Sequence, residues 1–65
     1  MEDLINNLEG EIVVLEGEIE SMKEYVDSEK ELSKIQLILI GKQIDLKEQY
    51  INILKARIIM YKLGV

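Results

Sequence analysis

Carboxylates are the most numerous side chains here that could do chemistry, because thirteen of the 65 residues are Asp or Glu and none is His or Cys. Thiol and imidazole nucleophiles are therefore excluded, as are zinc sites built from Cys and His. Glutamates on helices can hold bridged metal pairs, but those sites add a Glu-x-x-His element. We therefore interpret the glutamates as solvated groups and expect a non-enzyme with no metal, no cofactor and no catalytic residue.

One short segment of the second half is similar to a known catalytic element. Gly41-Lys42-Gln43-Ile44-Asp45 keeps the apolar-Asp pair of the Ser-Gln-Glu-Leu-Asp core on the second helix of small helical-hairpin phosphatases of bacterial sporulation regulators. The segment lacks the serine and the Gln-Glu order of that core. We interpret Asp45 as a surface residue beside Lys42 and Lys47, and an aspartyl-phosphate phosphatase-like hairpin is the alternative function.

Charge is distributed unevenly along the chain. Residues 1–32 contain eleven acids and two bases, a net charge of −9, whereas residues 33–65 contain two acids and six bases, a net charge of +4. A parallel coiled coil would place acid against acid, so this distribution predicts antiparallel packing of the two halves. The acidic half also opposes binding to nucleic acid and to anionic membrane surfaces.

The elements that position these charges begin with an apolar repeat in the first half. Its steps alternate between three and four residues, which is the pattern of a coiled-coil helix. We predict a helix over about residues 2–26, with Gly10 and Gly17 on its outermost, solvated face; the alternative use of the two glycines is a smooth patch for a partner backbone. The repeat consists of Ile5, Leu8, Ile12, Leu15, Ile19, Met22 and Val26.

Polar residues interrupt the repeat after Val26. Ser28 followed by Glu31 has the spacing of a helix N-terminal capping box, so we predict a turn at about residues 27–29 and a second helix over about residues 30–63. The chain is then one all-α domain, an antiparallel helical hairpin of coiled-coil type spanning residues 1–65. The alternative is a single long helix in an antiparallel coiled coil, because no proline enforces the break.

Two apolar stripes follow the second helix and together cover more of its surface than one neighbouring helix can bury. The main stripe is Leu37, Ile40, Ile44, Lys47, Ile51, Leu54, Ile58, Tyr61 and Val65, and the side stripe is Leu39, Leu46, Tyr50, Ile53 and Met60. We therefore expect this helix to contact more than one partner.

A turn near residues 27–28 makes the second helix longer than the first, so residues 53–65 are expected to overhang. An exposed apolar overhang needs cover, and chains this small often gain stability by association. We therefore predict that two hairpins dimerise into a four-helix bundle. The predicted oligomer interface is Ile51, Leu54, Ile58, Tyr61 and Leu63.

The groups outside this core suggest protein binding as the function. An acidic face with a tyrosine would be attracted to a larger protein with a basic surface. By size and charge, we predict a small non-enzymatic regulator or inhibitor, encoded by a phage or another mobile element; the third reading is a peripheral membrane-surface peptide. The predicted partner-binding residues are Glu9, Glu16, Glu20, Glu24 and Tyr25.

Two features of the sequence bear on location. The opening Met-Glu-Asp lacks the basic start of a signal peptide, and the longest uncharged apolar run, residues 35–41, is far shorter than the roughly 20 residues of a membrane span. We therefore expect a cytoplasmic protein, in a bacterial cell or in an infected host.

Overall fold

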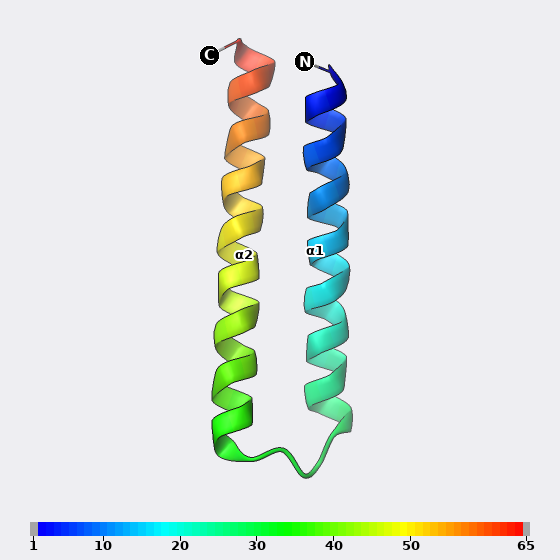
Figure 1. Ribbon diagram of the computed structural model, residues 1–65, viewed down its shortest axis with the longest axis vertical. Helices are drawn as coiled ribbons and strands as arrows, with labels where there is room; N and C mark the ends of the chain where they lie inside the picture. Colours follow the sequence, from blue (N-terminus) through cyan, green and yellow to red (C-terminus); the bar gives the residue numbers. More distant parts are fainter. Residues whose placement is uncertain (1, 65) are drawn as a thin grey trace.

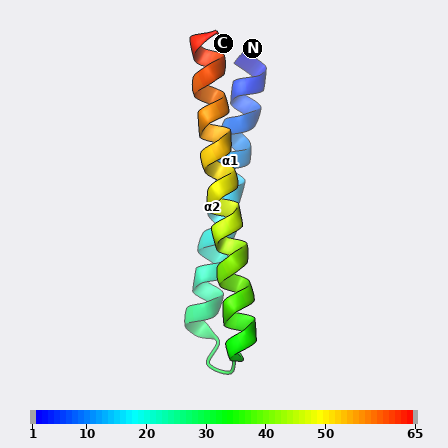
Figure 2. The same cartoon turned by 90° about the vertical axis from the view of Figure 1, so that its left-hand side faces the viewer.

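Two antiparallel helices form the whole of the described structure. The computed structural model describes residues 2–64, in which α1 (Glu2–Ser28) and α2 (Lys34–Leu63) are joined by a short loop (Figure 1). These residues form no strand, and the two helices pack along their length, with α2 passing in front of α1 in the view of Figure 2. The predicted all-α antiparallel hairpin is therefore confirmed, and the single long helix is excluded.

The turn lies later in the chain than the sequence predicted. Helix α1 continues to Ser28, and α2 begins at Lys34 behind Ser33, whose Oγ accepts a hydrogen bond from the Gln36 backbone at 3.1 Å. The Gln36 side chain returns the contact by accepting from the Ser33 N–H at 2.8 Å, which completes a capping box.

The prediction that Ser28 caps the second helix is thus wrong. Ser28 lies in the last turn of α1, where its Oγ donates to the carbonyl of Tyr25 at 3.2 Å. Both serines are followed three residues later by Glu or Gln, so capping chemistry does not separate them. The start at Lys34 suits packing, because the main apolar stripe of α2 begins only at Leu37.

The far end of α2 closes on a glycine. Gly64 has a left-handed backbone (φ 78°, ψ 25°), and its N–H donates to the carbonyls of Met60 and Tyr61. Glycine adopts this conformation without the steric cost that a Cβ atom brings, which is why it commonly follows the last turn of a helix.

The core is a single seam between the two helices. Leu54 is its centre, with no exposed surface. Ile5, Ile44 and Tyr61 are partly buried against the seam. The core positions that the repeat predicted in α1 are confirmed from Leu8 to Ile19, whereas Met22 and Val26 near the loop are only half-buried. The buried residues are Leu8, Ile12, Leu15, Ile19, Ile51, Leu54 and Ile58.

The predicted apolar overhang does not exist. The loop is centred near residue 31, so the start of α1 lies beside the end of α2 (Figure 1). Ile51, Leu54 and Ile58 were assigned to contacts between chains, but they are buried against α1 of the same chain. Of the other two predicted interface residues, Tyr61 is half-buried and Leu63 is exposed.

Candidate protein-interaction surface

The predicted partner-binding residues lie on α1 but do not form one surface. Glu9, Glu16, Glu20 and Glu24 follow each other at steps of seven, four and four residues, which places them along one side of the helix. We call these four glutamates the acidic row. Tyr25 is on another side of α1, where it lines a groove with Met22 and Gln43. The structure therefore separates Tyr25 from the glutamates.

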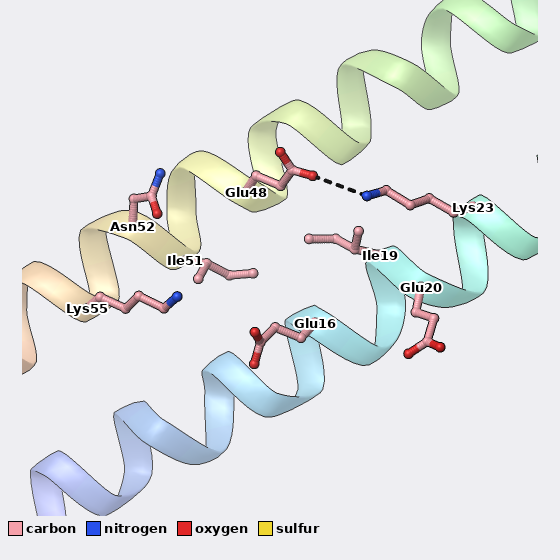
Figure 3. Close-up of a pocket in the computed structure, with 8 residues that line it drawn as sticks. All are labelled: Glu16, Ile19, Glu20, Lys23, Glu48, Ile51, Asn52 and Lys55. Atoms are coloured by element: carbon pink, nitrogen blue, oxygen red, sulfur yellow. Dashed lines mark ion pairs between the residues drawn. The ribbon is translucent and has the colours of Figure 1, made fainter.

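Two members of the acidic row, Glu16 and Glu20, border a groove between the helices (Figure 3). Its volume is about 460 Å³, and Ile19 and Ile51 lie between its charged walls. Glu16 and Lys55 extend into the gap from opposite helices, whereas Glu20 points away from α2 (Figure 3). The lining residues are Glu16, Ile19, Glu20, Lys23, Glu48, Ile51, Asn52 and Lys55.

One ion pair crosses this groove. Lys23 Nζ lies 3.7 Å from Glu48 Oε1 (Figure 3), and both side chains are about half exposed. Exposed pairs of this kind contribute roughly 0–1 kcal/mol, because water screens the charges. The pair therefore acts mainly by neutralising a lysine and a glutamate, which leaves Glu16, Glu20 and Lys55 as the remaining charged residues of the groove.

On the opposite side of the hairpin, two acids of α1 contact side chains of α2. Lys47 Nζ lies 3.5 Å from Glu18 Oε1, and the hydroxyl of Tyr50 donates a hydrogen bond to Glu11 Oε1 at 2.7 Å. This hydrogen bond, together with the negative charge of Glu11, raises the pKa of Tyr50 above its ordinary value. Glu11 and Glu18 are thereby engaged within the chain.

Arg57 is engaged on the same side of α2. Its Nη2 donates to the hydroxyl of Tyr61 at 3.3 Å, and its guanidinium carbon lies 5.8 Å from the centre of that ring. The hydrogen bond that Arg57 donates to Tyr61 raises the pKa of Arg57 further above its ordinary value. Arg57 is thus held along α2 rather than extended toward the acids of α1.

The acidic row differs from these engaged groups. Within residues 2–64, none of its four carboxylates makes an ion pair or a side-chain hydrogen bond. Helix α1 carries nine acids and one base, a net charge of −8, against two acids and six bases, a net charge of +4, on α2. The acidic row is therefore an available negative surface on a hairpin with opposite charges on its two helices.

The segment that resembles a phosphatase core is not arranged as one site. Asp45 is exposed and makes no ion pair or side-chain hydrogen bond within residues 2–64. Gln43 lies only two residues earlier on the same helix, and residues at that spacing point to different sides. Gln43 instead lines the groove that contains Tyr25.

Metal binding and membrane insertion also bear on function. Across the described residues, no three His, Cys, Asp or Glu side chains are grouped so that they could hold a metal ion. Neither α1 nor α2 contains a stretch that is both long enough and apolar enough to cross a membrane.

Sequence reasoning missed the contacts that cross between the helices. The bond from Tyr50 to Glu11 and the two ion pairs depend on the alignment of α1 with α2, which the misplaced turn had shifted. The separation of Tyr25 from the acidic row could have been predicted from the sequence. Glu24 and Tyr25 are neighbours, and adjacent residues of a helix point in different directions.

Comparison of the chain with protein-family models, with curated proteins and with solved structures gave no match. The fold and the surface define the class of molecule in structural terms alone. It is an antiparallel helical hairpin with an acidic helix and a mixed-charge groove.

Proposed function

We propose that this protein is a non-enzymatic interaction module whose acidic row binds a basic surface on a larger protein. The observation that carries the proposal is the lack of any ion pair or side-chain hydrogen bond from Glu9, Glu16, Glu20 and Glu24 within residues 2–64. Acids that served only to hold the hairpin together would be engaged across it, as Glu11 and Glu18 are.

The groove beside the acidic row favours a protein as the ligand. Ile19 and Ile51 offer apolar contact between charged walls, and Glu16 and Glu20 stand at its edge. Such a surface fits an apolar side chain flanked by Arg or Lys, which is a common composition at protein interfaces. The contact surface comprises the acidic row and this groove, and Tyr25 lies outside it.

A module of this kind acts by occupying a site on its partner. By covering a basic site on its partner, such as a site that otherwise holds a polyanion, the hairpin would regulate or inhibit that partner without doing chemistry. Charge attraction would accelerate association of the hairpin with its partner. Salt would weaken this attraction, since the screening length falls from about 8 Å at 0.15 M to about 3 Å at 1 M. The proposal includes a cytoplasmic location and a role as a small mobile-element regulator.

The test is capture of a partner from a lysate, followed by measurement of its affinity with purified protein. Replacement of Glu16 and Glu20 by lysine reverses two charges of the acidic row, and we expect the affinity to fall at least tenfold. The matched control replaces Glu29 and Glu31, two exposed loop residues, by lysine, which makes the same change in net charge. Equal affinities for both double variants would refute the proposal.

A further inference from the structure

A row of large apolar side chains on α2 is left uncovered by the hairpin. Leu39, Leu46, Ile53 and Met60 recur at every seventh residue, so they lie along one line of the helix. They are 55%, 64%, 57% and 50% exposed, respectively. We call these four residues the α2 stripe.

The α2 stripe lies on the side of the hairpin away from the acidic row. Leu46 and Ile53 stand four residues before and three residues after Tyr50, so they share its side of α2. Tyr50 reaches Glu11, whereas the acidic row borders the groove that contains Lys23 and Lys55. A molecule that covered the α2 stripe would therefore leave the proposed partner surface open.

On this same side, α1 offers small residues. Val14, Gly17 and Ser21 line a second groove with Gln43 and Lys47 of α2. A Cβ atom built on Gly17, or on Gly10 one heptad earlier, would have no neighbouring atom within 4 Å. The side thus combines large apolar residues on one helix with room above the backbone of the other.

We propose that a second copy of this chain covers the α2 stripe with its own α1. The two hairpins stack with their loops at the same end, around a two-fold axis parallel to the helices. Each α2 then lies antiparallel to the α1 of the other copy, and the two contacts are equivalent, as a closed dimer requires. The result is a four-helix bundle in which every neighbouring pair of helices is antiparallel.

Charge selects this arrangement over its alternative. With the loops at the same end, α1 with its net charge of −8 faces α2 of the partner with its net charge of +4 at both contacts. With the loops at opposite ends, α1 would face α1 and α2 would face α2, so that like charges meet throughout. Juxtaposed like charges disfavour an interface, which leaves the first arrangement.

Spacing supports the same arrangement. A two-fold axis parallel to the helices keeps both copies at the same height, so residue i of α1 lies near residue 65 minus i of either copy's α2, as Glu18 and Lys47 do within one chain. Leu46 then comes within about one helical turn of Gly17 of the partner subunit, and Ile53 within about one turn of Gly10 of the partner subunit. Leu46 and Ile53 are seven residues apart, as are Gly17 and Gly10, so a large side chain comes near a glycine at both positions.

The available area is sufficient for a stable dimer. The hairpin measures 49 by 15 Å across its broad side, which offers about 700 Å² per copy and about 1,400 Å² in total. Specific interfaces bury about 1,200–2,000 Å². A second copy therefore meets the usual requirement without any added segment.

The first test measures mass by light scattering at micromolar concentration. We expect about 15 kDa for the wild type, twice the chain mass of 7.5 kDa. Ile53→Glu should reduce the mass to that of one chain, whereas Ile59→Glu should leave the dimer intact, because Ile59 is 58% exposed but lies off the α2 stripe. A monomeric wild type, or equal masses for the two variants, would overturn the proposal.

A second pair of variants tests the contact without introducing charge. Gly17→Leu removes the room above α1 and should give a monomer whose helical circular dichroism is retained, because leucine favours helix. Gly41→Leu is the matched control on α2, where an added Cβ also meets nothing within 4 Å. A Gly17→Leu protein that stays dimeric would contradict the proposed packing.

The orientation is tested by a spin label at Glu31 in the loop, in the otherwise unchanged chain. Loops at the same end predict an interchain separation below about 25 Å, given helices packed about 8–10 Å apart. A separation near the 49 Å length of the hairpin would instead establish opposite ends and overturn the arrangement. Binding to lipid vesicles with retention of monomeric mass would overturn it in favour of a membrane surface.

Discussion

Leu54 gives the sharpest test of the hairpin itself. It is the one described side chain with no exposed surface, and it packs in the seam with residues of α1. Leu54→Ala removes buried methyl groups and leaves a gap, which costs about 2–5 kcal/mol in protein cores. The seam is only two helices wide, so neighbours can collapse into the gap, and we expect about 3 kcal/mol, in the lower half of that range.

Urea unfolding followed by circular dichroism measures this loss. With a dependence on urea of about 1 kcal/mol per molar, typical of the smallest proteins, the midpoint should fall by about 3 M. Leu63→Ala is the matched control, because Leu63 is 73% exposed, and it should change stability by less than about 0.5 kcal/mol. Both proteins must be compared at one concentration, since association stabilises the folded state.

The outcome separates two roles for Leu54. If Leu54 lies within the hairpin, the loss persists at the lowest concentration, where any dimer has dissociated. If it instead packed between chains, as the predicted overhang implied, the loss would vanish on dilution. If Leu54→Ala does not fold, Ile58→Val provides a milder test, because it should lower the free energy of unfolding by only about 1 kcal/mol. Equal effects of Leu54→Ala and Leu63→Ala would refute the seam.

Three further predictions concern the caps and the contact between helices. Ser33→Ala should destabilise the hairpin by about 1 kcal/mol and Ser28→Ala by less than about 0.5 kcal/mol in urea unfolding, because only Ser33 caps α2; the reverse order would restore the earlier turn. Glu11→Gln should lower the pKa of Tyr50 toward about 10, as read from its ring resonances in NMR titration. Since the pKa of Tyr50 is raised in the folded state, the stability that the hydrogen bond contributes is present below about pH 10 and is lost as pH rises through the folded pKa. An unchanged pKa of Tyr50 in Glu11→Gln would contradict the assigned hydrogen bond. Gly64→Ala should cost about 1 kcal/mol at its left-handed position and speed amide exchange in the last turn of α2, whereas unchanged exchange would show that this cap is dispensable.

The core could be predicted from sequence because burial follows periodicity. Leu8 to Ile19 and Ile51 to Ile58 are the residues that an alternation of three and four steps places on one face, and they are the buried residues. Even Lys47, the only polar member of the α2 repeat, is half-buried and pairs with Glu18. The hydrophobic pattern therefore predicted which face of each helix is buried in the seam.

The alignment of the two helices could not be predicted in the same way. It depends on the position of the turn, because each residue by which the turn is displaced shifts every cross-helix pairing by two. Ser28 and Ser33 offer similar capping chemistry, so the choice between them lies in packing along the whole length of the hairpin. The overhang was a consequence of that single misplacement.

The candidate surface depends more on where each residue lies around α1 than on how α1 is aligned along α2. Residues of α1 that look alike in sequence, such as Glu16 and Glu18, lie on opposite sides of the hairpin, one at an open groove and one in an ion pair. The sequence shows where each acid lies around the helix, but only the packed second helix shows which acids are engaged. Tyr25 was separated from the acidic row for the same reason.

The start of α1 and the end of α2 lie at the same end of the hairpin, so the fold could be encoded with its helices in either order. The first turn of α1 and the last turn of α2 lie side by side (Figure 1), and packed helices lie about 8–10 Å apart, a gap that about three to five added residues would span. A circular permutant joined there and opened within residues 29–33 would keep the same antiparallel seam. The order in which the two helices are translated is therefore immaterial to the core, and only their opposed directions matter.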